Sequence, residues 1–504
     1  MSESSSYRQI LRSTSIIGGA AALNIGIGLL RMKAVALLLG PAGVGLIGLA
    51  TNVVALVSNV AGMGFGNVGT RQIAEAAGRD DPTAIATARR ALFWGTLGLA
   101  VLGGLALWTF RALVAKHLLG DPSQARLVGC LAPAVALTVA TASQGALLTG
   151  LRRIGDLARV QVAGSVLATA LGLAALWAWG QAGIVAYVIA APLAAFVFGH
   201  LFVARLPKVR GSGGGLPALA DQWRTLARLG AAFMVAGLAG TAGQLLVRTL
   251  VQRELGPEAL GQFQAAWALS MTYIGFVLGA MGTDYYPRLT AVIADPAAVN
   301  RLVNQQTEVA LLLATPVLLA TLALAPWVVR LLYSAEFGEA ASVLRWQVLG
   351  DFLKVASWPL GFILLASGAG RTFMVTEWLA VISFVLFTWL ALPWMGVTAT
   401  GLAFLGMYMI LLPMVYALAR RRTGFTWDRA VAWHLLLAFI AALGLAGVAE
   451  WSPVAAALAG VPLAGVAGVY SAARLGRMAS LGGGLGNAFI AIQQGLKKTK
   501  VWRG

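Results

Sequence analysis

The fold of this chain is decided by a short stretch that occurs twice. It reads Leu39-Gly40-Pro41-Ala42-Gly43-Val44-Gly45 and returns as Leu255-Gly256-Pro257-Glu258-Ala259-Leu260-Gly261, at an offset of 216 residues. Each copy joins two long apolar segments, where its Pro and Gly end one helix and let the chain reverse. Arg12 and Arg228, and Gly66 and Gly282, match at the same offset. We therefore predict a duplicated six-helix lobe, arranged as a parallel repeat around a central cavity.

The composition is that of a membrane protein. The 504 residues are 59% hydrophobic and 11% charged, whereas a soluble domain carries about 25% charged residues. The mean hydropathy is +0.81, and the 61 glycines agree with the frequent use of Gly in membrane helices. We expect an all-α polytopic membrane protein.

Apolar runs and basic residues together predict the topology. Fourteen runs approach the about 20 apolar residues that a spanning helix needs, from about 13–39 to about 453–473. The run at 127–150 contains Pro133, and twelve spans is the alternative count. With a cytoplasmic N-terminus, 27 of the 37 cations fall in cytoplasmic segments and four in the opposite loops. This excess places both termini in the cytoplasm.

The predicted organisation has five parts. They are an N-lobe of helices 1–6 at residues 1–204, a cytoplasmic inter-lobe linker at 205–222, a C-lobe of helices 7–12 at 223–422, helices 13–14 at 423–474, and a cytoplasmic amphipathic or disordered tail at 475–504. The linker contains a run of Gly and Ser, which makes it flexible.

Four cations lie inside apolar segments: Arg31, Lys33, Arg248 and Lys354. A charge at membrane depth is costly and normally faces protein or a water-filled cavity. Since all four are positive, they point to an anionic ligand, and Arg can hold phosphate oxygens in a bidentate way. Two alternatives stay open: Arg31 and Lys33 snorkel to the headgroups, or Lys354 forms an ion pair with Asp351 one helical turn away. We predict that these cations bind phosphate groups, which the family resemblance described below implies to be those of a diphosphate.

Acidic and amide side chains in the spans give two further sets of candidates. Intramembrane acids mark ion pathways, so the candidates for proton or sodium coupling are Asp351, Asp284, Glu377 and Glu308. An interfacial anchor explains Asp284 equally well, and Glu308 could be merely solvated. Six amides could line a wet cavity and bind sugar hydroxyls, or could join helices: Asn24, Asn52, Asn59, Gln244, Gln262 and Gln264.

Several classes of function have no motif in this sequence. The histidines His117, His200 and His434 are scattered and show no metal-ligand spacing. The chain has no Walker A loop, and its one cysteine, Cys130, excludes a cysteine metal cluster. The cations occur in short clusters between spans, which is typical of topology rather than of nucleic-acid binding. We expect no catalytic residue, no cofactor, no metal and no nucleic-acid partner.

One region resembles a known family. Leu332-Tyr333-Ser334, Phe337, Leu344-Arg345-Trp346-Gln347 and Gly350-Asp351-Phe352-Leu353-Lys354 resemble the tenth-helix region of the O-antigen and lipid III flippase (Wzx-like) family. The turn at 39–45 and the glycine-rich run from Gly62 to Asn67 are similar too, and the likeness covers about residues 8–422. The family belongs to the polysaccharide transporter branch of the multidrug/oligosaccharidyl-lipid/polysaccharide (MOP) exporter superfamily.

The resemblance implies a fold and a function. The fold is a V-shaped pair of six-helix lobes. The function is movement of an undecaprenyl-diphosphate-linked oligosaccharide from the inner to the outer leaflet of the bacterial inner membrane, by ion-coupled alternating access. Membrane lipids, a polysaccharide polymerase and a chain-length regulator are the implied partners.

Helices 13 and 14 depart from the usual twelve-helix pattern and are similar to the extra helices of the lipid II flippase. Three alternatives remain: a lipid II flippase, a multidrug exporter of the same superfamily, and a non-transporting membrane scaffold for glycan assembly.

Overall fold

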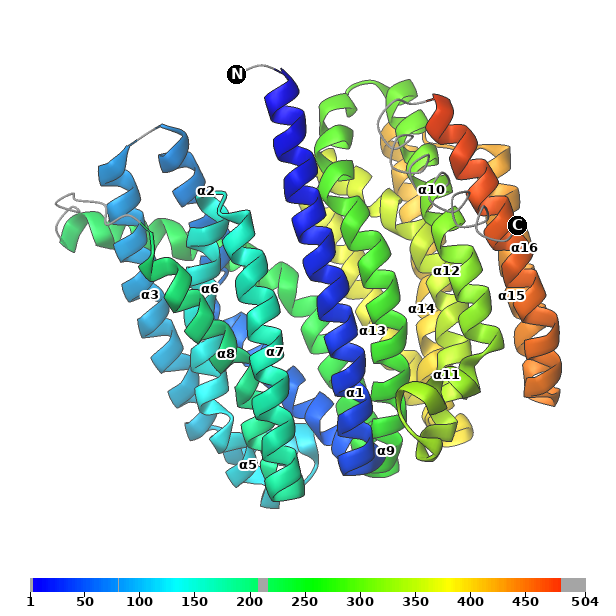
Figure 1. Ribbon diagram of the computed structural model, residues 1–504, viewed down its shortest axis with the longest axis horizontal. Coiled ribbons are helices and arrows are strands. Elements are labelled where there is room, and N and C mark those ends of the chain that lie inside the picture. The colour runs from blue at the N-terminus through cyan, green and yellow to red at the C-terminus, as the bar shows by residue number, and fades with distance from the viewer. Residues whose placement is uncertain (1–2, 80, 207–215, 482–504) are drawn as a thin grey trace, which may run out of the picture. The chain divides into compact units, whose positions relative to one another are not determined.

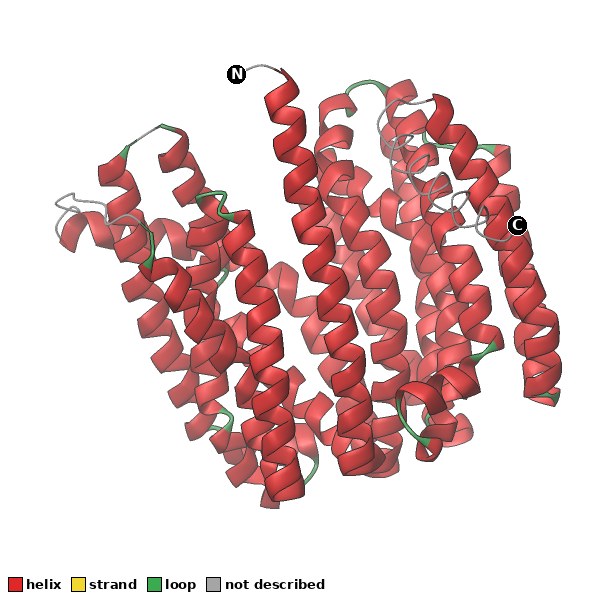
Figure 2. Cartoon of the chain, viewed as in Figure 1, coloured by secondary structure: helices red, strands yellow, loops and turns green. Residues whose placement is uncertain are grey.

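The computed structural model describes residues 3–79, 81–206 and 216–481, with side chains from residue 19 onward apart from a few positions. All regular structure in these ranges is helical, as Figure 2 shows. The central part of the predicted linker, residues 207–215, and the end of the predicted tail, residues 482–504, lie outside the described residues. The all-α prediction is confirmed for the described part of the chain.

The helices follow one another with short connections (Figure 1). The first half of the chain contains α1 (Glu3–Gly62), α2 (Phe65–Gly78), α3 (Pro82–Thr109), α4 (Arg111–Val114), α5 (Ala125–Cys130), α6 (Ala132–Gly150), α7 (Ile154–Trp179), α8 (Ile184–Ala204) and α9 (Leu216–Val292). The second half contains α10 (Pro296–Ala323), α11 (Ala325–Leu332), α12 (Gly338–Ala366), α13 (Gly370–Met395), α14 (Thr398–Thr423), α15 (Arg429–Trp451) and α16 (Pro453–Leu481).

The two long helices α1 and α9 are each broken at the glycine of the repeated stretch. Gly40 has φ 62° and ψ −170°, and Gly256 has φ 84° and ψ −178°. This backbone region is open almost only to glycine. The Leu-Gly-Pro stretch therefore interrupts both helices where the sequence predicted a turn.

A third break lies earlier than expected. The second of the fourteen predicted apolar runs covers about 44–68, but α1 ends within it, at Gly62. Gly64 has φ 65°, and a Cβ on it would meet the carbonyl oxygen of Gly230. Glycine is needed at this position for both its left-handed backbone and the close approach.

Ten helical segments among the described residues are long and apolar enough to cross a membrane, or eleven if a bent pair within α9 counts as one span. Segments 19–62 and 154–204 have 44 and 51 residues. One crossing requires about 20 residues, so each segment is long enough for two crossings. The chain is a multi-pass membrane protein, while fourteen crossings and the two-lobe repeat stay predictions.

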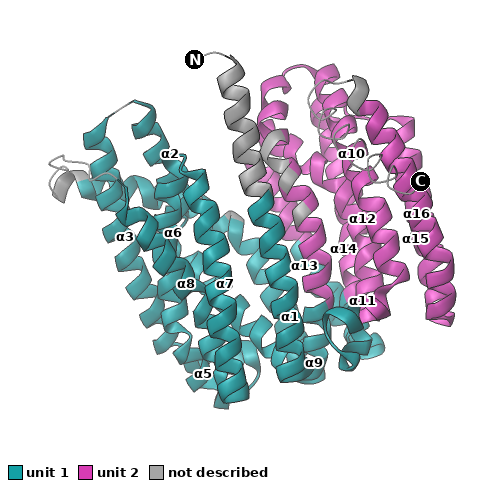
Figure 3. Ribbon diagram, in the orientation of Figure 1, with its two compact units in different colours: residues 1–265, 329–340, 381–400 teal, residues 266–328, 341–380, 401–504 magenta. Residues whose placement is uncertain are grey.

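The chain forms two compact units, coloured separately in Figure 3. Unit 1 comprises residues 1–265, 329–340 and 381–400, and unit 2 comprises residues 266–328, 341–380 and 401–504. The predicted lobe boundaries at 204 and 223 stay a prediction.

Within unit 1, α2, α3, α6 and α7 enclose an apolar cluster that includes Phe65, Leu92, Leu147 and Leu226. The start of α9 joins this cluster, because Trp223 Nε1 donates to the carbonyl oxygen of Ala91 in α3 at 2.8 Å.

Within unit 2, α10 packs against α15 and α16. Asn304 of α10 fixes the segment before α15: its Nδ2 donates to the carbonyl oxygen of Thr426 at 3.0 Å, and its Oδ1 accepts from the amide of Asp428 at 2.8 Å. Two helices beyond residue 423 are thus attached to unit 2 by polar as well as apolar contacts.

Candidate functional site: a cationic cavity and two polar clusters

Arg31 lines a cavity of about 440 Å³ in unit 1, enclosed by α1, α6, α7 and α8. Asn24 and Arg31 lie two helical turns apart on α1, so they share one face. The polar side chains that join them are Thr141 and Gln144 of α6 and Gln161 and Ser165 of α7. No acidic side chain lines this cavity among the described residues. Its polar lining is therefore cationic and neutral.

Two acceptors of the cavity are available for hydrogen bonds. Asn24 Oδ1 and Gln144 Oε1 are buried and have no protein partner among the described side chains. A buried polar atom without a partner costs about 1–3 kcal/mol. A ligand or water that donates hydrogen bonds to these oxygens would remove that cost.

Arg248 of α9 is the centre of a second polar cluster in unit 1. It is 3% exposed. Its Nε donates to Gln264 Oε1 at 3.0 Å, and its Nη1 donates to the carbonyl oxygen and Oε1 of Gln244 at 3.1 and 3.3 Å. The guanidinium carbon lies 5.6 Å from the ring centroid of Phe263. Three predicted site residues, Arg248, Gln244 and Gln264, are thus brought together.

Asn52 of α1 contacts the same arginine. The orientation of its amide follows from the hydrogen-bond network: with Oδ1 toward Arg248 it accepts from Nη1 at 3.3 Å, and Nδ2 donates to the carbonyl oxygen of Thr241 at 3.1 Å. Asn59, two helical turns further on, lies against Gly237, where a Cβ would meet its Nδ2 at 2.7 Å. Both amides therefore join α1 to α9.

Lys33 and Gln262 bind the polar backbone of residues 330–340. Lys33 Nζ donates to the carbonyl oxygens of Tyr333 at 2.5 Å and Arg330 at 3.2 Å. It therefore satisfies carbonyls at the end of α11, where a positive charge also complements the helix dipole. Gln262 donates to the carbonyl oxygen of Glu336 at 2.8 Å and accepts from the amide of Ala340 at 3.0 Å. A diphosphate role for Lys33 and a glycan role for Gln262 stay predictions.

Asp351 and Lys354 lie on α12 in unit 2. Asp351 is fully buried, its Oδ2 accepts from the hydroxyl of Ser270 at 2.6 Å, and its Oδ1 has no partner among the described side chains. Lys354 Nζ lies 3.1 Å from the sulfur of Met271 and 5.8 Å from the ring centroid of Phe404. Asp351 and Lys354 are not among the ion pairs closer than 4.0 Å that the described residues form. The direct contacts of each charge described here are thus with neutral side chains, while the two charges still interact over a longer distance.

Three acidic candidates differ in their surroundings. Glu377 of α13 is within electrostatic range of Lys354 and so belongs to the same cluster. Glu308 of α10 accepts from Arg474 Nε of α16 at 2.9 Å, with its side chain 15% exposed. The side chain of Asp284 lies outside the described part of the structure.

Sequence reasoning did not single out the polar lining contributed by α6 and α7. Thr141 and Gln144 are spaced i, i+3, and Gln161 and Ser165 are spaced i, i+4. Such pairs lie on one helix face. Paired polar positions inside an apolar run are the signal that would have found them.

The chain belongs to the polysaccharide biosynthesis protein family, whose sequence profile matches residues 10–292. Among curated proteins it is similar to the lipid III flippase of Escherichia coli (strain K12), with 22% identity over 418 residues that cover 79% of this chain and 96% of that protein.

Two solved structures show the same fold. The lipid II flippase MurJ in an inward closed conformation superposes with a TM-score of 0.70 and 12% identity, covering 91% of this chain and 98% of that one. An inward-facing multidrug resistance MATE family transporter of the MOP superfamily gives a TM-score of 0.68 and 17% identity, covering 80% of this chain and 98% of that one. The predicted MOP-superfamily membership and the prediction of a non-catalytic transporter are confirmed.

Proposed function

We propose that the protein is a flippase for an undecaprenyl-diphosphate-linked oligosaccharide and moves it from the cytoplasmic to the periplasmic leaflet of the bacterial inner membrane. The observation that carries this proposal is the cavity around Arg31, which combines a guanidinium with amides and hydroxyls. A substrate with an anionic diphosphate and a hydroxyl-rich glycan needs both kinds of group. The similarity to a lipid III flippase supports the same substrate class.

The diphosphate is the part of the substrate that is hardest to move. Taking an ion out of water costs several kcal/mol even after the protein relaxes. A fixed guanidinium offsets part of that cost, because it offers two parallel N–H donors to phosphate oxygens. In this proposal Arg31 and Arg248 hold the diphosphate, and Lys33 and Lys354 contribute positive potential.

The glycan would occupy the neutral polar part of the cavity. Sugar hydroxyls donate hydrogen bonds, and Asn24 and Gln144 have acceptor oxygens without protein partners among the described residues. Asn52, Asn59, Gln244, Gln262 and Gln264 would bind sugar only by exchanging their present partners. Asn24 is therefore the strongest of the six predicted glycan ligands.

Ion coupling would act through the cluster in unit 2. Asp351 is buried beside Ser270 with one oxygen free of described partners. A proton or sodium ion on that oxygen would neutralise a buried carboxylate and change its interaction with Lys354 and Glu377. Glu308 and Asp284 are the alternative candidates for ion coupling. Alternating access would then be linked to ion binding at Asp351.

A lipid II flippase is the second candidate function. Helices α15 and α16 extend the chain beyond the twelve predicted helices of the repeat, and the fold of MurJ covers 91% of this chain. Lipid II carries a diphosphate as well, so the cationic cavity fits both substrates. A multidrug exporter fits less well, since cationic drugs favour an acidic cavity. A scaffold would have no use for the cavity.

The proposal is tested with purified protein in vesicles that contain a fluorescent undecaprenyl-diphosphate-linked oligosaccharide. We expect flipping by the wild type and at least a tenfold loss in Arg31→Gln and Arg248→Gln, because each loses a diphosphate donor. Arg79→Gln, at an exposed position after α2, is the matched control and should flip normally. Full flipping by Arg31→Gln would refute the diphosphate role.

The substrate class is tested in the same vesicles. Flipping of labelled lipid II in place of the oligosaccharide lipid would select the second candidate. Export of a cationic dye with no flipping of either lipid would select a multidrug exporter. A protein that moves none of these, yet binds a polysaccharide polymerase or chain-length regulator, would be the scaffold.

A further inference from the structure

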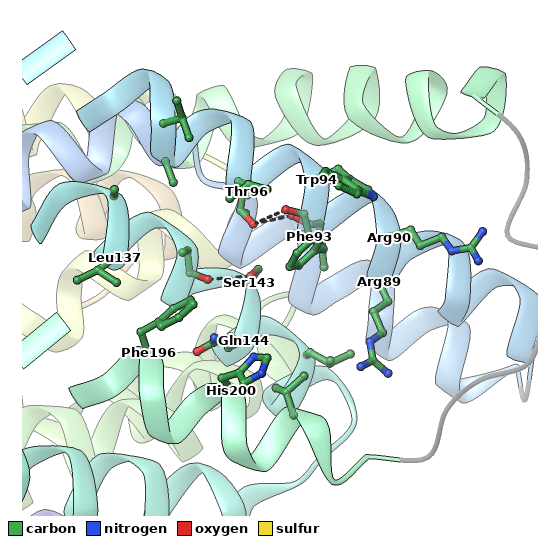
Figure 4. A pocket seen from close by; sticks show the side chains of 18 of the residues that line it. Arg89, Arg90, Phe93, Trp94, Thr96, Leu137, Ser143, Gln144, Phe196 and His200 are labelled. Carbon is green, nitrogen blue, oxygen red and sulfur yellow. Dashed lines mark hydrogen bonds between the residues drawn. The ribbon is translucent and has the colours of Figure 1, made fainter. Parts of the chain in front are cut away.

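Unit 1 contains a second cavity, which lies between α3, α6 and α8. Gln144 is the one lining residue that it shares with the Arg31 cavity. The proposed function does not use this second cavity. Its volume is about 680 Å³, within the usual range of about 300–1,000 Å³ for ligand sites. Figure 4 shows Phe93 and Trp94 of α3, Leu137 of α6 and Phe196 of α8 around it. We call it the α3–α6–α8 groove.

Between its ends the groove is lined mainly by apolar side chains, with Gln144 as its one amide among the described residues. Its hydroxyls are already used within their own helices: Thr96 Oγ1 donates to the carbonyl oxygen of Leu92 at 2.6 Å, and Ser143 Oγ to that of Ala140 at 2.8 Å. On the α3 side, Phe93 and Val101 are 54% and 51% exposed. In a multi-pass membrane protein these side chains face lipid. The occupant of the groove is therefore an apolar chain that enters from the bilayer.

One end of the groove is cationic. Arg89 and Arg90 stand at the start of its α3 wall, whereas His200 of α8 lies further along the lining, beside Gln144 (Figure 4). No acidic side chain lines the groove among the described residues. The two side chains point in different directions from α3 (Figure 4), and each guanidinium can bind phosphate oxygens in a bidentate way. The occupant thus carries an anionic phosphate at the arginine end and hydrocarbon along the rest.

The length of the groove selects between two kinds of anionic lipid. Val101 lies twelve positions after Arg89 on the α3 wall, or about 18 Å at the helical rise of about 1.5 Å per residue. That is close to half of the about 30 Å hydrocarbon thickness of a bilayer. It suits the acyl chains of one leaflet, whereas an undecaprenyl chain is much longer.

We infer that the α3–α6–α8 groove binds one anionic phospholipid of the leaflet on the arginine side, with its phosphate at Arg89 and Arg90 and its acyl chains between Phe93, Leu137 and Phe196. Trp94 at the rim supports this depth, since Trp prefers the membrane–water interface. This lipid site shares only Gln144 with the Arg31 cavity.

The test is native mass spectrometry of the delipidated full-length protein, titrated with dioleoyl phosphatidylglycerol and, separately, with dioleoyl phosphatidylcholine. We expect one phosphatidylglycerol to bind at least tenfold more tightly than phosphatidylcholine. Arg89→Gln/Arg90→Gln should abolish this preference. Arg420→Gln/Arg421→Gln removes the same charge from exposed positions at the end of α14 and should preserve it. Equal effects of the two double variants would overturn the site.

A second variant tests the hydrocarbon part. Ala140 lines the groove, and Ala140→Phe should weaken binding of both lipids at least fivefold, while circular dichroism and gel filtration stay those of the wild type. Normal binding by a folded Ala140→Phe protein would contradict the groove as the site. If that variant does not fold, the arginine pair alone decides. Displacement of phosphatidylglycerol by equimolar undecaprenyl phosphate would also refute the phospholipid.

Discussion

Gly45 of α1 and Gly261 of α9 face each other across a contact that leaves neither of them room for a side chain. A Cβ on Gly45 would lie 2.7 Å from the amide nitrogen of Gly261 and 2.8 Å from the carbonyl oxygen of Pro257. A Cβ on Gly261 would overlap the carbonyl of Pro41. The two glycines and the two prolines occupy equivalent positions of the repeated stretch. Reciprocal contacts of this kind are typical of two copies related by a two-fold axis, and they support the predicted repeat.

Gly261→Ala should destabilise the protein. Overpacking of a tight site costs about 1–3 kcal/mol, and here the neighbour is backbone, which cannot rotate away. We expect a lower apparent Tm in detergent, measured by thermal-shift fluorescence. Gly240→Ala in the same helix is the control, because a Cβ there meets nothing within 4 Å. An unchanged Tm in Gly261→Ala would contradict the close contact.

Asp351→Asn should remove ion coupling without loss of the fold. An amide oxygen can still accept the hydrogen bond from Ser270, but the side chain no longer carries a titratable proton. We expect flipping that no longer responds to an imposed pH or sodium gradient, measured separately in vesicles. Ser270→Ala keeps the carboxyl group and should keep the response. A normal gradient response in Asp351→Asn would remove Asp351 from the coupling mechanism.

Glu308 and Arg474 should contribute to stability as a pair. Partly exposed ion pairs contribute about 0.2–1 kcal/mol. We expect Glu308→Gln and Arg474→Gln each to lower the apparent Tm, and the double variant to lower it by less than the sum. Vesicle assays on Glu308→Gln then test whether Glu308 takes part in ion coupling. If flipping no longer responds to the gradient, Glu308 is a coupling residue. If the response is normal and only the stability is reduced, Glu308 serves only in the ion pair with Arg474.

The start of α3 should loosen in acid. The hydroxyl of Thr83 and the amide of Ala84 donate to the carboxylate of Asp81 and hold its pKa below the usual value. Because the pKa is lowered in the folded state, this stabilisation is present above the ordinary carboxyl pKa and is lost as the pH falls through the lowered one. Hydrogen exchange of the first turn of α3 should therefore speed up in acid.

Asp81→Asn is the control for this pH effect. Asn also caps helices well but does not titrate in this range. Exchange in the variant should depend on pH only through the chemistry of the amides themselves. A variant that shows the same acid-induced loosening as the wild type would exclude the Asp81 carboxylate as its cause.

The features that could be predicted from the sequence are those that depend on residue type and on spacing within one helix. The breaks at Gly40 and Gly256 follow from a residue type that alone tolerates the required backbone. The different environments of Arg31 and Lys33 follow from their spacing of two residues on a helix. The partners of these side chains were not predictable, because Lys33 binds carbonyls about 300 positions away in the sequence. Ser270 and Met271 around Asp351 and Lys354 were missed for the same reason.

The contact of Lys33 with main-chain carbonyls has a consequence for how this family diverges. An ammonium group that binds peptide oxygens depends only on the path of the backbone, so this contact places no demand on the side chain at 330, whereas the side chain of Tyr333 is buried against Phe337. The basic residue at 33 has no such freedom. Among distant relatives, the residue at 330 should therefore vary while the residue at 33 stays basic.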